Sequence, residues 1–131
     1  MLGSYKQKIL KMQAAMRPST RPMRLHRKVG FAEFNDPGIV SYDTLLPYVG
    51  RTYINRGFNS TSVGGASWSG EVHLIIDAPI GTPMNHVQDY SLHPGENETT
   101  LAAHLIYEIL SVKKKGSTTE VHVRVIGVAT P

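Results

Sequence analysis

The chain has 131 residues, of which 40% are hydrophobic and 18% are charged. This composition is typical of one globular domain and excludes a disordered chain. The sequence contains no cysteine, which excludes a disulfide framework and a thiolate metal site. It also has no run of about eighteen apolar residues that could cross a membrane, and its start does not have the pattern of a signal peptide.

Positive charge is concentrated at the start of the chain. The net charge is +4, but the first 28 residues hold eight of the 14 lysines and arginines and none of the ten acidic residues. A cationic segment joined to a weakly acidic body is typical of a protein that binds a polyanion, an anionic membrane or another copy of itself. The cations of this segment are Lys6, Lys8, Lys11, Arg17, Arg21, Arg24, Arg27 and Lys28.

The charge and the hydropathy pattern together predict two units. Residues 1–22 form a flexible basic arm, in which Ser4 to Met16 has the spacing of a short amphipathic helix. Residues 23–131 form a single β-rich domain. Its first segment, Met23 to Phe34, alternates apolar and basic residues, which predicts a strand with one buried and one basic face, interrupted at Arg27.

A turn at Asn35–Gly38 separates this strand from a predicted helix, Tyr42–Tyr48, which Ser41 can cap. Tyr42 and Leu45 also have the spacing of tyrosine motifs that bind adaptor proteins as extended peptides. Binding of that kind needs an exposed and unpaired backbone. Because Tyr42 lies beside the turn, Tyr42 and Leu45 remain a possible adaptor motif.

The stretch from Asn59 to Gly70 is rich in glycine and serine and predicts a mobile loop. A loop of this kind can become ordered against a neighbouring subunit, which makes Gly64, Gly65 and Trp68 candidates for self-association. The next segment, Glu71–Asp77, alternates in hydropathy and predicts a strand.

The last third of the chain predicts a C-terminal hairpin. The runs His104–Val112 and Thr119–Val128 are rich in β-formers, and a glycine follows the lysines between them. Met84–Leu92 fits a strand or a short helix, and Thr100–Leu110 also fits a helical start because Leu101, Leu105 and Ile109 are spaced by four. The lysines at the turn, a possible second phosphate or lipid contact, are Lys113, Lys114 and Lys115. The elements predict an α+β fold: a twisted antiparallel β-sheet with this hairpin and one or two short helices.

A search for catalytic and metal-binding motifs returns weak candidates. Ser67 lies in a segment similar to a nucleophile elbow, but the second glycine is missing and a strand follows. His86, Asp89 and His93 form the best metal cluster, yet no known spacing brings all three to one ion.

Two further patterns give no site. Glu96 and Glu98 lie in a polar turn without apolar neighbours that would raise a carboxyl pKa, so they do not form an acid–base pair. Asn59-Ser60-Thr61 and Asn97-Glu98-Thr99 match the glycosylation pattern, which we ascribe to chance. The sequence therefore predicts no catalytic residue, no metal site, no cofactor and no enzyme activity.

Three segments carry a family resemblance. Trp68–Ile76 has a glycine leading into an apolar strand, Leu105–Lys114 is an apolar strand that ends in paired lysines, and Ser41–Leu45 has the pattern of a helix start. Together they resemble the matrix proteins of rhabdoviruses, of the vesiculovirus kind. The resemblance implies a twisted antiparallel sheet with two helices, and a protein that polymerises beneath a viral envelope.

The arm and the resemblance lead to one expected function. The chain is expected to be a non-enzymatic, matrix-like structural protein that self-assembles and bridges the viral nucleocapsid and an anionic membrane. It would be found in the virion, in the host cytoplasm and at the inner face of the host membrane, without a small-molecule substrate. The alternative is an RNA-binding or capsid protein that uses the basic arm on nucleic acid, and the sequence does not decide between lipid and RNA.

Overall fold

A computed structural model describes the protein at residues 13–63, 70–86 and 98–130. In these ranges nine strands form one hydrogen-bonded sheet, in the order β1-β6-β7-β4-β2-β5-β9-β8-β3. The strands are β1 (Arg17–Pro18), β2 (Met23–Val29), β3 (Thr52–Asn55), β4 (Asn59–Ser62), β5 (Val72–Ala78), β6 (Pro83–His86), β7 (Glu98–Leu101), β8 (Leu105–Lys115) and β9 (Thr118–Val128). The helices between β2 and β3 are η1 (Phe31–Phe34), α2 (Tyr42–Leu45) and η2 (Leu46–Tyr48).

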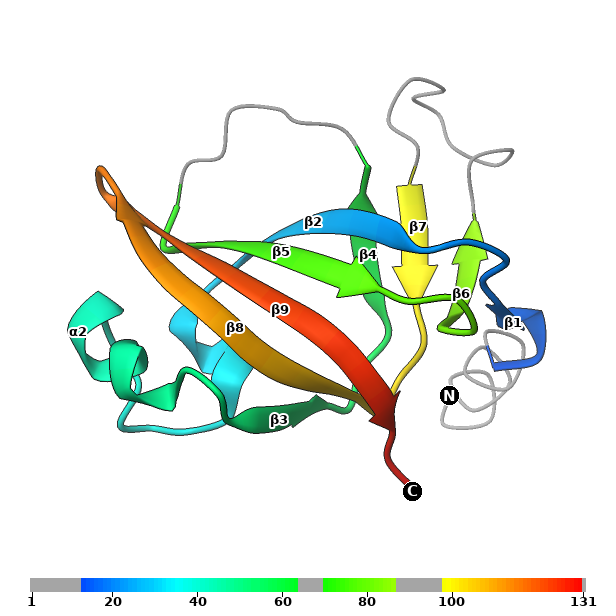
Figure 1. Ribbon diagram of the computed structural model, residues 1–131, viewed down its shortest axis with the longest axis horizontal. Coiled ribbons are helices and arrows are strands. Elements are labelled where there is room, and N and C mark those ends of the chain that lie inside the picture. Colours follow the sequence, from blue (N-terminus) through cyan, green and yellow to red (C-terminus); the bar gives the residue numbers. More distant parts are fainter. Residues whose placement is uncertain (1–12, 64–69, 87–97, 131) are drawn as a thin grey trace, which may run out of the picture.

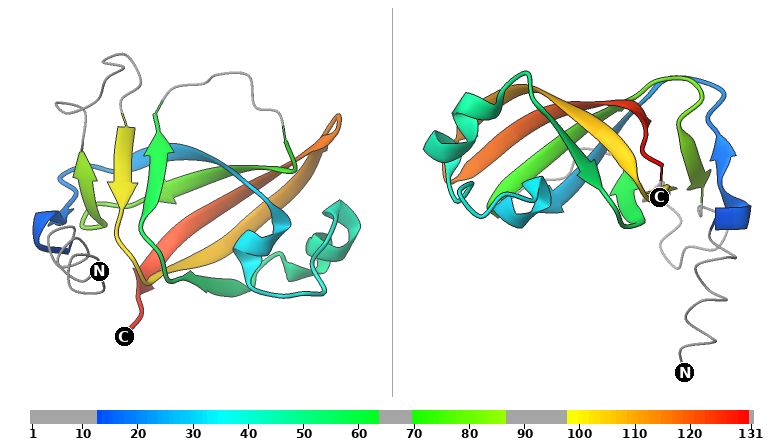
Figure 2. Two further views of the ribbon diagram at one scale, coloured as in Figure 1. Left: turned by 180° about the vertical axis from the view of Figure 1, so that it is seen from behind. Right: turned by 90° about the horizontal axis from the view of Figure 1, so that it is seen from below.

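The sheet is divided into two parts whose strands run across each other (Figure 1, and from two further sides in Figure 2). The larger part contains β3, β8, β9, β5 and β2, and the smaller part contains β4, β7, β6 and β1. The two parts meet where β2 pairs with β4, through the register pair His26–Ser62. This junction places the end of β4 at the middle of β2, with β7 on the far side of β4.

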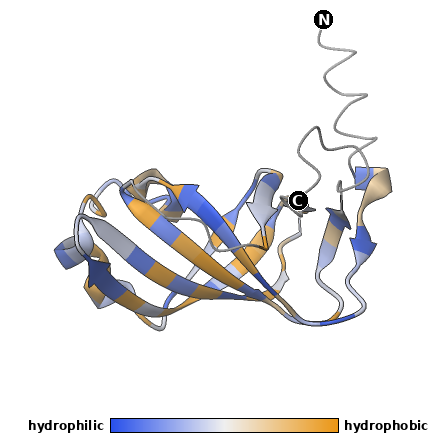
Figure 3. Cartoon of the chain, turned by 90° about the horizontal axis from the view of Figure 1, so that it is seen from above, coloured by the Kyte–Doolittle hydropathy of each residue, from blue (hydrophilic) through white to orange (hydrophobic). Residues whose placement is uncertain are grey.

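Hydropathy alternation builds the larger part of the sheet. Along β5, Val72, Leu74 and Ile76 are buried and the residues between them are half-buried. The long strands accordingly show alternating hydrophobic and hydrophilic bands in Figure 3. Because successive side chains of a strand point to opposite faces, this pattern covers one face with the core and leaves the other polar. The predicted strand at Glu71–Asp77 is confirmed.

The sheet is mixed, so the prediction of an antiparallel sheet is wrong in this respect. β5 and β9 are parallel neighbours, with Leu74 opposite Val121 and Ile76 opposite Val123. The chain leaves the larger part after β5, forms β6 and β7, and returns through β8 before β9 is added. Alternation identifies the buried face of a strand but not the direction of its neighbour, which is why the sequence pattern missed this pairing.

The predicted C-terminal hairpin is confirmed. β8 and β9 pair from Leu105–Val128 to Lys115–Thr118, and Gly116 supplies the positive φ of 63° that the turn needs. The helical alternative for Thr100–Leu110 is wrong, because the chain leaves β7 at Leu101 and starts β8 at Leu105. Residues four apart share a face in a strand as well as in a helix, so spacing alone could not separate the two.

The predicted helix after Asn35–Gly38 is confirmed as α2 followed by η2. Ser41 and Thr44 form a reciprocal capping box, in which the Thr44 backbone N–H donates to the Ser41 hydroxyl and the Ser41 N–H donates to the Thr44 hydroxyl. Pro47 follows, and the chain tightens into a 3₁₀ turn that ends at Tyr48.

Three other element boundaries predicted from the sequence differ from those in the structure. The predicted loop Asn59–Gly70 begins with the strand β4, which pairs with β7. The predicted strand Met23–Phe34 ends at Val29, and its last residues form η1. Arg17 and Pro18, assigned to the basic arm, pair with β6. Within the described ranges, no helix is both long enough and apolar enough to span a membrane.

Candidate functional site

Arg27 is a charged residue on the core-facing side of β2. It is two residues from the fully buried Leu25 and is paired in register with Leu74, which is also fully buried. Only 17% of the Arg27 side chain is exposed. A guanidinium in such surroundings is stable only when it is paired and hydrogen-bonded.

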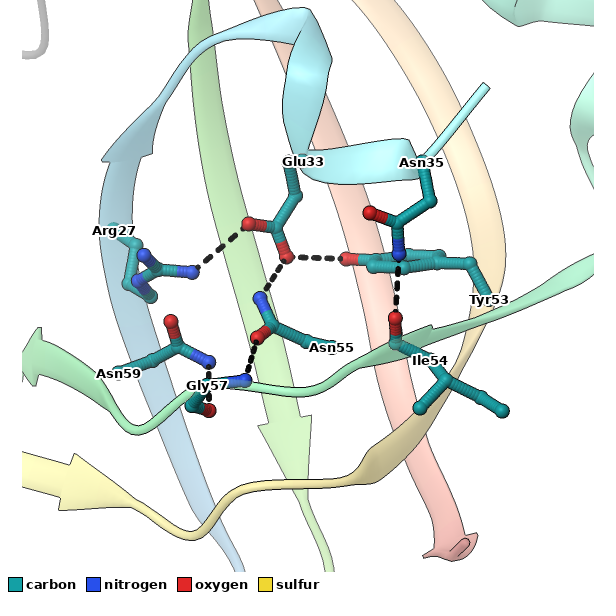
Figure 4. Close-up of polar contacts among 8 residues, drawn as sticks. All are labelled: Arg27, Glu33, Asn35, Tyr53, Ile54, Asn55, Gly57 and Asn59. Carbon is teal, nitrogen blue, oxygen red and sulfur yellow. Dashed lines mark hydrogen bonds and ion pairs between the residues drawn. The ribbon is translucent and has the colours of Figure 1, made fainter. Parts of the chain in front are cut away.

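Glu33 on η1 supplies the partner. Arg27 Nη1 donates to Glu33 Oε1 at 3.1 Å, and the Glu33 side chain is 6% exposed. The second carboxylate oxygen, Oε2, accepts hydrogen bonds from the Tyr53 hydroxyl at 3.1 Å and from Asn55 Nδ2 at 2.9 Å. Figure 4 shows these contacts joining β2, η1 and β3. The carboxylate is therefore held by donors from two strands.

The same network continues into the start of β4. The Gly57 backbone N–H donates to Asn55 Oδ1 at 3.0 Å, and Asn59 Nδ2 donates to the Gly57 carbonyl at 3.1 Å. Asn59 itself is buried and is the first residue of β4. The contacts that hold Glu33 thus also fix the turn through which the chain enters β4 (Figure 4).

β4 carries the hydroxyl-rich run Ser60-Thr61-Ser62. Thr61 is buried, and its hydroxyl donates to the Thr99 carbonyl of β7 at 2.6 Å. Ser60 is exposed and Ser62 is half-buried, in agreement with strand alternation. Ser62 is paired with His26 on one side and with Glu98 on the other.

These registers place three kinds of polar residue at neighbouring backbone positions across the junction of the sheet. Arg27 follows the residue that pairs with Ser62, and Glu98 pairs with Ser62 from the opposite side. With neighbouring strands about 4.8 Å apart, the row spans on the order of 10 Å of backbone. A cation, hydroxyls and a carboxylate are the groups that can bind a phosphorylated sugar and stabilise positive charge on its ring.

Tyr53 is a donor that stays protonated. Burial, followed by the neighbouring Glu33 carboxylate, raises its pKa well above the usual value. Its ring stacks on Tyr107 at 5.3 Å between centroids and contacts Phe34 edge-on at 5.2 Å. Packing therefore fixes the orientation of the hydroxyl that donates to Glu33.

A cavity of about 660 Å³ adjoins this network on the side of η1 and β3. Glu33, Tyr53 and Asn55 border it, together with Arg51 and Arg56. None of its lining residues belongs to β4 or β7. The cavity and the β2–β4–β7 row are thus separate features, and Glu33 connects them because it borders the cavity and pairs with Arg27.

The outer face of β2 and β5 carries a second polar group. His26 Nδ1 and His73 Nε2 lie 2.9 Å apart, and burial is the main cause that lowers the pKa of both imidazoles. Asp77 accepts from Arg24 at 2.8 Å and contacts His122 Nε2 at 2.6 Å. Within the described residues, no group of three side chains is suited to hold a metal ion.

The predicted polyanion-binding cations lie in different surroundings. Arg17, Arg21 and Lys28 are exposed, whereas Arg24 and Arg27 of the same set are paired with carboxylates in the sheet. Lys113, Lys114 and Lys115 are exposed at the end of the C-terminal hairpin. The cations Lys6, Lys8 and Lys11, the self-association candidates Gly64, Gly65 and Trp68, and the candidate residues Ser67, Asp89 and His93 lie outside the described residues.

The structure also places Tyr42 and Leu45 in a helix. Leu45 is fully buried in α2, and Tyr42 is half-buried. An adaptor-binding segment needs an exposed, extended backbone, which this helix does not offer.

Sequence reasoning missed the three elements of the row. In the sequence, Arg27 interrupts the predicted strand, and a charge at an inward position is the signal of a buried, paired group. Ser60-Thr61-Ser62 was assigned to a loop, and its hydroxyls were linked to a chance glycosylation pattern. Glu98 was placed in a polar turn, whereas it is the first residue of β7.

Comparisons with known proteins identify the fold. No family model matches the chain, and no curated protein matches it in sequence. Among solved structures, Plx2a, an ADP-ribosyltransferase toxin from Paenibacillus larvae, has a TM-score of 0.82 at 21% identity, over 95% of this chain and 72% of that one. The chain also covers 68% of C3stau2 from S. aureus with NAD, and this match includes 92% of the present chain at 16% identity and a TM-score of 0.65.

A third solved structure is BECa, an ADP-ribosylating toxin of a C. perfringens binary enterotoxin, with NADH. Its TM-score is 0.74 at 18% identity, over 95% of this chain and 36% of that chain. The chain therefore spans only about a third of BECa. These likenesses assign the ADP-ribosyltransferase fold.

The predicted kinship with rhabdovirus matrix proteins is wrong, because the solved structures that share this fold include the ADP-ribosyltransferase toxin Plx2a and the ADP-ribosylating toxin BECa. The expected non-enzymatic role fails with it, as do the nucleocapsid, RNA and membrane partners and the claim of no small-molecule substrate. The RNA-binding alternative gains no support either. The apolar strands and paired lysines that carried the resemblance occur in many half-buried sheets, so they do not identify a family.

Proposed function

We propose that the chain is an NAD-dependent ADP-ribosyltransferase. The observation that carries the proposal is that Arg27, the Ser60–Ser62 strand and Glu98 occupy neighbouring backbone positions where β2, β4 and β7 pair. The proposal is supported by the fold, since solved structures that share it include an NAD and an NADH complex.

The reaction breaks the bond between C1′ of the nicotinamide ribose and the ring nitrogen. Nicotinamide leaves with the bonding electrons and becomes neutral, while positive charge develops on the ribose ring, as in glycoside hydrolysis. A nucleophile of the acceptor then bonds to C1′ and loses its proton to the surrounding base or water. When water is the acceptor, the products are free ADP-ribose and nicotinamide.

Each kind of residue in the row can bind or stabilise a different chemical group of NAD. The planar guanidinium of Arg27 matches the two charges of the diphosphate. The Ser60 and Ser62 hydroxyls suit the sugar hydroxyls and the carboxamide, because a hydroxyl both donates and accepts. Glu98 is the acidic residue of the row, and a carboxylate stabilises the cationic ribose in the transition state.

The direct test is release of nicotinamide from NAD by the purified chain, with transfer of labelled ADP-ribose to proteins as a second readout. Arg27→Lys and Glu98→Gln are each expected to lower kcat/KM by about a hundredfold or more. Lys28→Gln, at an exposed position of β2, and Glu108→Gln, at an exposed pair with Arg124, are matched controls that keep activity. A wild-type chain that neither binds NAD nor releases nicotinamide would overturn the proposal.

The cellular location, the boundary between arm and domain and the binding of polyanions by the exposed cations stay predictions. They are independent of the row of residues described above. Removing residues 1–16, the part of the arm that precedes β1, and repeating the NAD assay would separate this part from the proposed activity, which we expect to persist because the row begins at Arg27.

A further inference from the structure

Glu33 is a buried carboxylate that is fully engaged by its neighbours. Its two oxygens accept from Arg27, from the Tyr53 hydroxyl and from Asn55 Nδ2, at 3.1, 3.1 and 2.9 Å. Figure 4 shows Glu33 between Arg27 on one side and Tyr53 and Asn55 on the other. Glu33 is therefore the link between Arg27 and β3.

We propose that Glu33 is a positioning residue that orients Arg27 toward the diphosphate of the dinucleotide, and that Tyr53 and Asn55 hold it in place. This inference rests on the function proposed above. It adds a residue outside the β2–β4–β7 row, on a helix that contributes nothing else to the row.

Arg27 has enough N–H donors to contact Glu33 and the diphosphate at the same time. The ion pair is formed through Arg27 Nη1, and a guanidinium has five N–H donors. Arg27 can thus bind an anion without leaving Glu33. A long, flexible side chain that is already held in one orientation loses less entropy when the substrate binds.

Local structure places Glu33 where it can do this. η1 begins directly after the bend at Gly30, and the Phe31 backbone N–H at its start donates to Glu71 Oε2 at 3.3 Å. A Cβ at Gly30 would lie 2.7 Å from the same Glu71 oxygen, so a larger residue there would require the exposed Glu71 side chain to move away from η1. The bend and the Glu71 contact hold η1 over β2.

Two physical effects oppose each other when Glu33 loses its charge. Arg27 becomes a stronger electrostatic attractor for phosphate, but it also loses the contact that orients it. The proposal requires that the second effect dominates. This makes the sign of the change in NAD affinity informative, and not only its size.

The test is steady-state NAD hydrolysis by the full chain, with KM and kcat measured separately. Glu33→Gln is expected to raise KM for NAD by about tenfold to a hundredfold, with a smaller change in kcat, since one misplaced group suffices for such a loss. Tyr53→Phe, which keeps the ring and removes one donor to Glu33, should shift KM in the same direction. Tyr107→Phe, in the ring stacked on Tyr53, is the matched control and should leave KM unchanged.

A double-mutant cycle tests whether Glu33 acts through Arg27. In an Arg27→Lys background, Glu33→Gln should change KM by less than about twofold, because the orientation that it protects is already lost. A lower melting temperature is expected in either case, but a merely structural role would leave KM of the folded enzyme unchanged. If Glu33→Gln fails to fold, Tyr53→Phe provides the same comparison.

The outcomes separate the two proposals. A wild-type chain without NAD binding or hydrolysis overturns the proposed function, and the positioning role with it. A wild-type chain that hydrolyses NAD, with a Glu33→Gln variant of equal or lower KM, overturns only the positioning role.

Discussion

The two faces of β2 carry ion pairs that differ in burial more than in length. On the outer face, Arg24 contacts Asp77 at 2.8 Å, and the side chains are 60% and 33% exposed. On the inner face, Arg27 contacts Glu33 at 3.1 Å, and the side chains are 17% and 6% exposed. The shorter contact is the weaker one, because water competes for both of its partners. Burial therefore decides which of the two ion pairs contributes more to the stability of the fold.

The two faces also differ in their connections. The inner pair is joined to Tyr53 and Asn55, which come from another strand. The outer face holds the His26–His73 contact and the contact of His122 with Asp77, on three adjacent strands. We therefore expect the inner face to respond to loss of a partner and the outer face to respond to pH.

The largest expected effect is on the inner pair. Glu33→Gln should lower the free energy of unfolding by about 3 kcal/mol, because it leaves a mostly buried guanidinium without its counter-charge. Urea denaturation monitored by circular dichroism measures this.

The control replaces both charges. Arg27→Met combined with Glu33→Leu should be closer to wild type than Glu33→Gln alone, since no uncompensated charge is left in the core. A double variant as unstable as the sum of its single substitutions would contradict the comparison of the two faces.

Much of the larger part of the sheet, and the helix beside it, could be predicted from the pattern of neighbouring residues in the sequence. The alternation in β5, the glycine after three lysines in the hairpin and the cap at Ser41 each depend on a few neighbouring residues, and each prediction was confirmed. The parallel pairing of β5 with β9 was missed, because it depends on the path of the chain through β6, β7 and β8.

The candidate site could not be predicted in the same way. Arg27, Ser62 and Glu98 are far apart in sequence, and each has an ordinary interpretation in isolation: an interruption in a strand with a basic face, a serine-rich loop and a polar turn. Only the pairing of β2 with β4 and of β4 with β7 brings them into one row. The one local signal was Arg27 at an inward position of an alternating strand.

A smaller effect is expected from pH on the outer face. The pKa values of His26 and His73 are lowered in the folded chain, mainly by burial, with Arg24 and the opposite imidazole as the next causes. The unfolded chain therefore binds more protons below about pH 6.5, and stability should fall as the pH drops through that value. Between the two ring nitrogens at 2.9 Å one must accept, so protonation of both rings also removes their hydrogen bond.

Urea denaturation at pH 7.5 and pH 5.5 measures this effect. His73→Gln should reduce the difference in stability between the two pH values. Asp77→Asn is the matched control, because the pKa of Asp77 is lowered, first by its hydrogen bond from Arg24, so its contribution is lost only below about pH 4. Equal pH dependence in wild type and His73→Gln would show that these histidines are not responsible.

The smallest effect is expected for the outer ion pair itself. Arg24→Gln should change the free energy of unfolding by about 0.5 kcal/mol or less at neutral pH, since the guanidinium is 60% exposed and its solvation replaces most of the contact. Raising the salt concentration should shrink even this difference, because exposed pairs are screened. A loss from Arg24→Gln as large as that from Glu33→Gln would mean that burial does not separate the two pairs. The outer face would then belong to the same structural network as Arg27, Glu33, Tyr53 and Asn55.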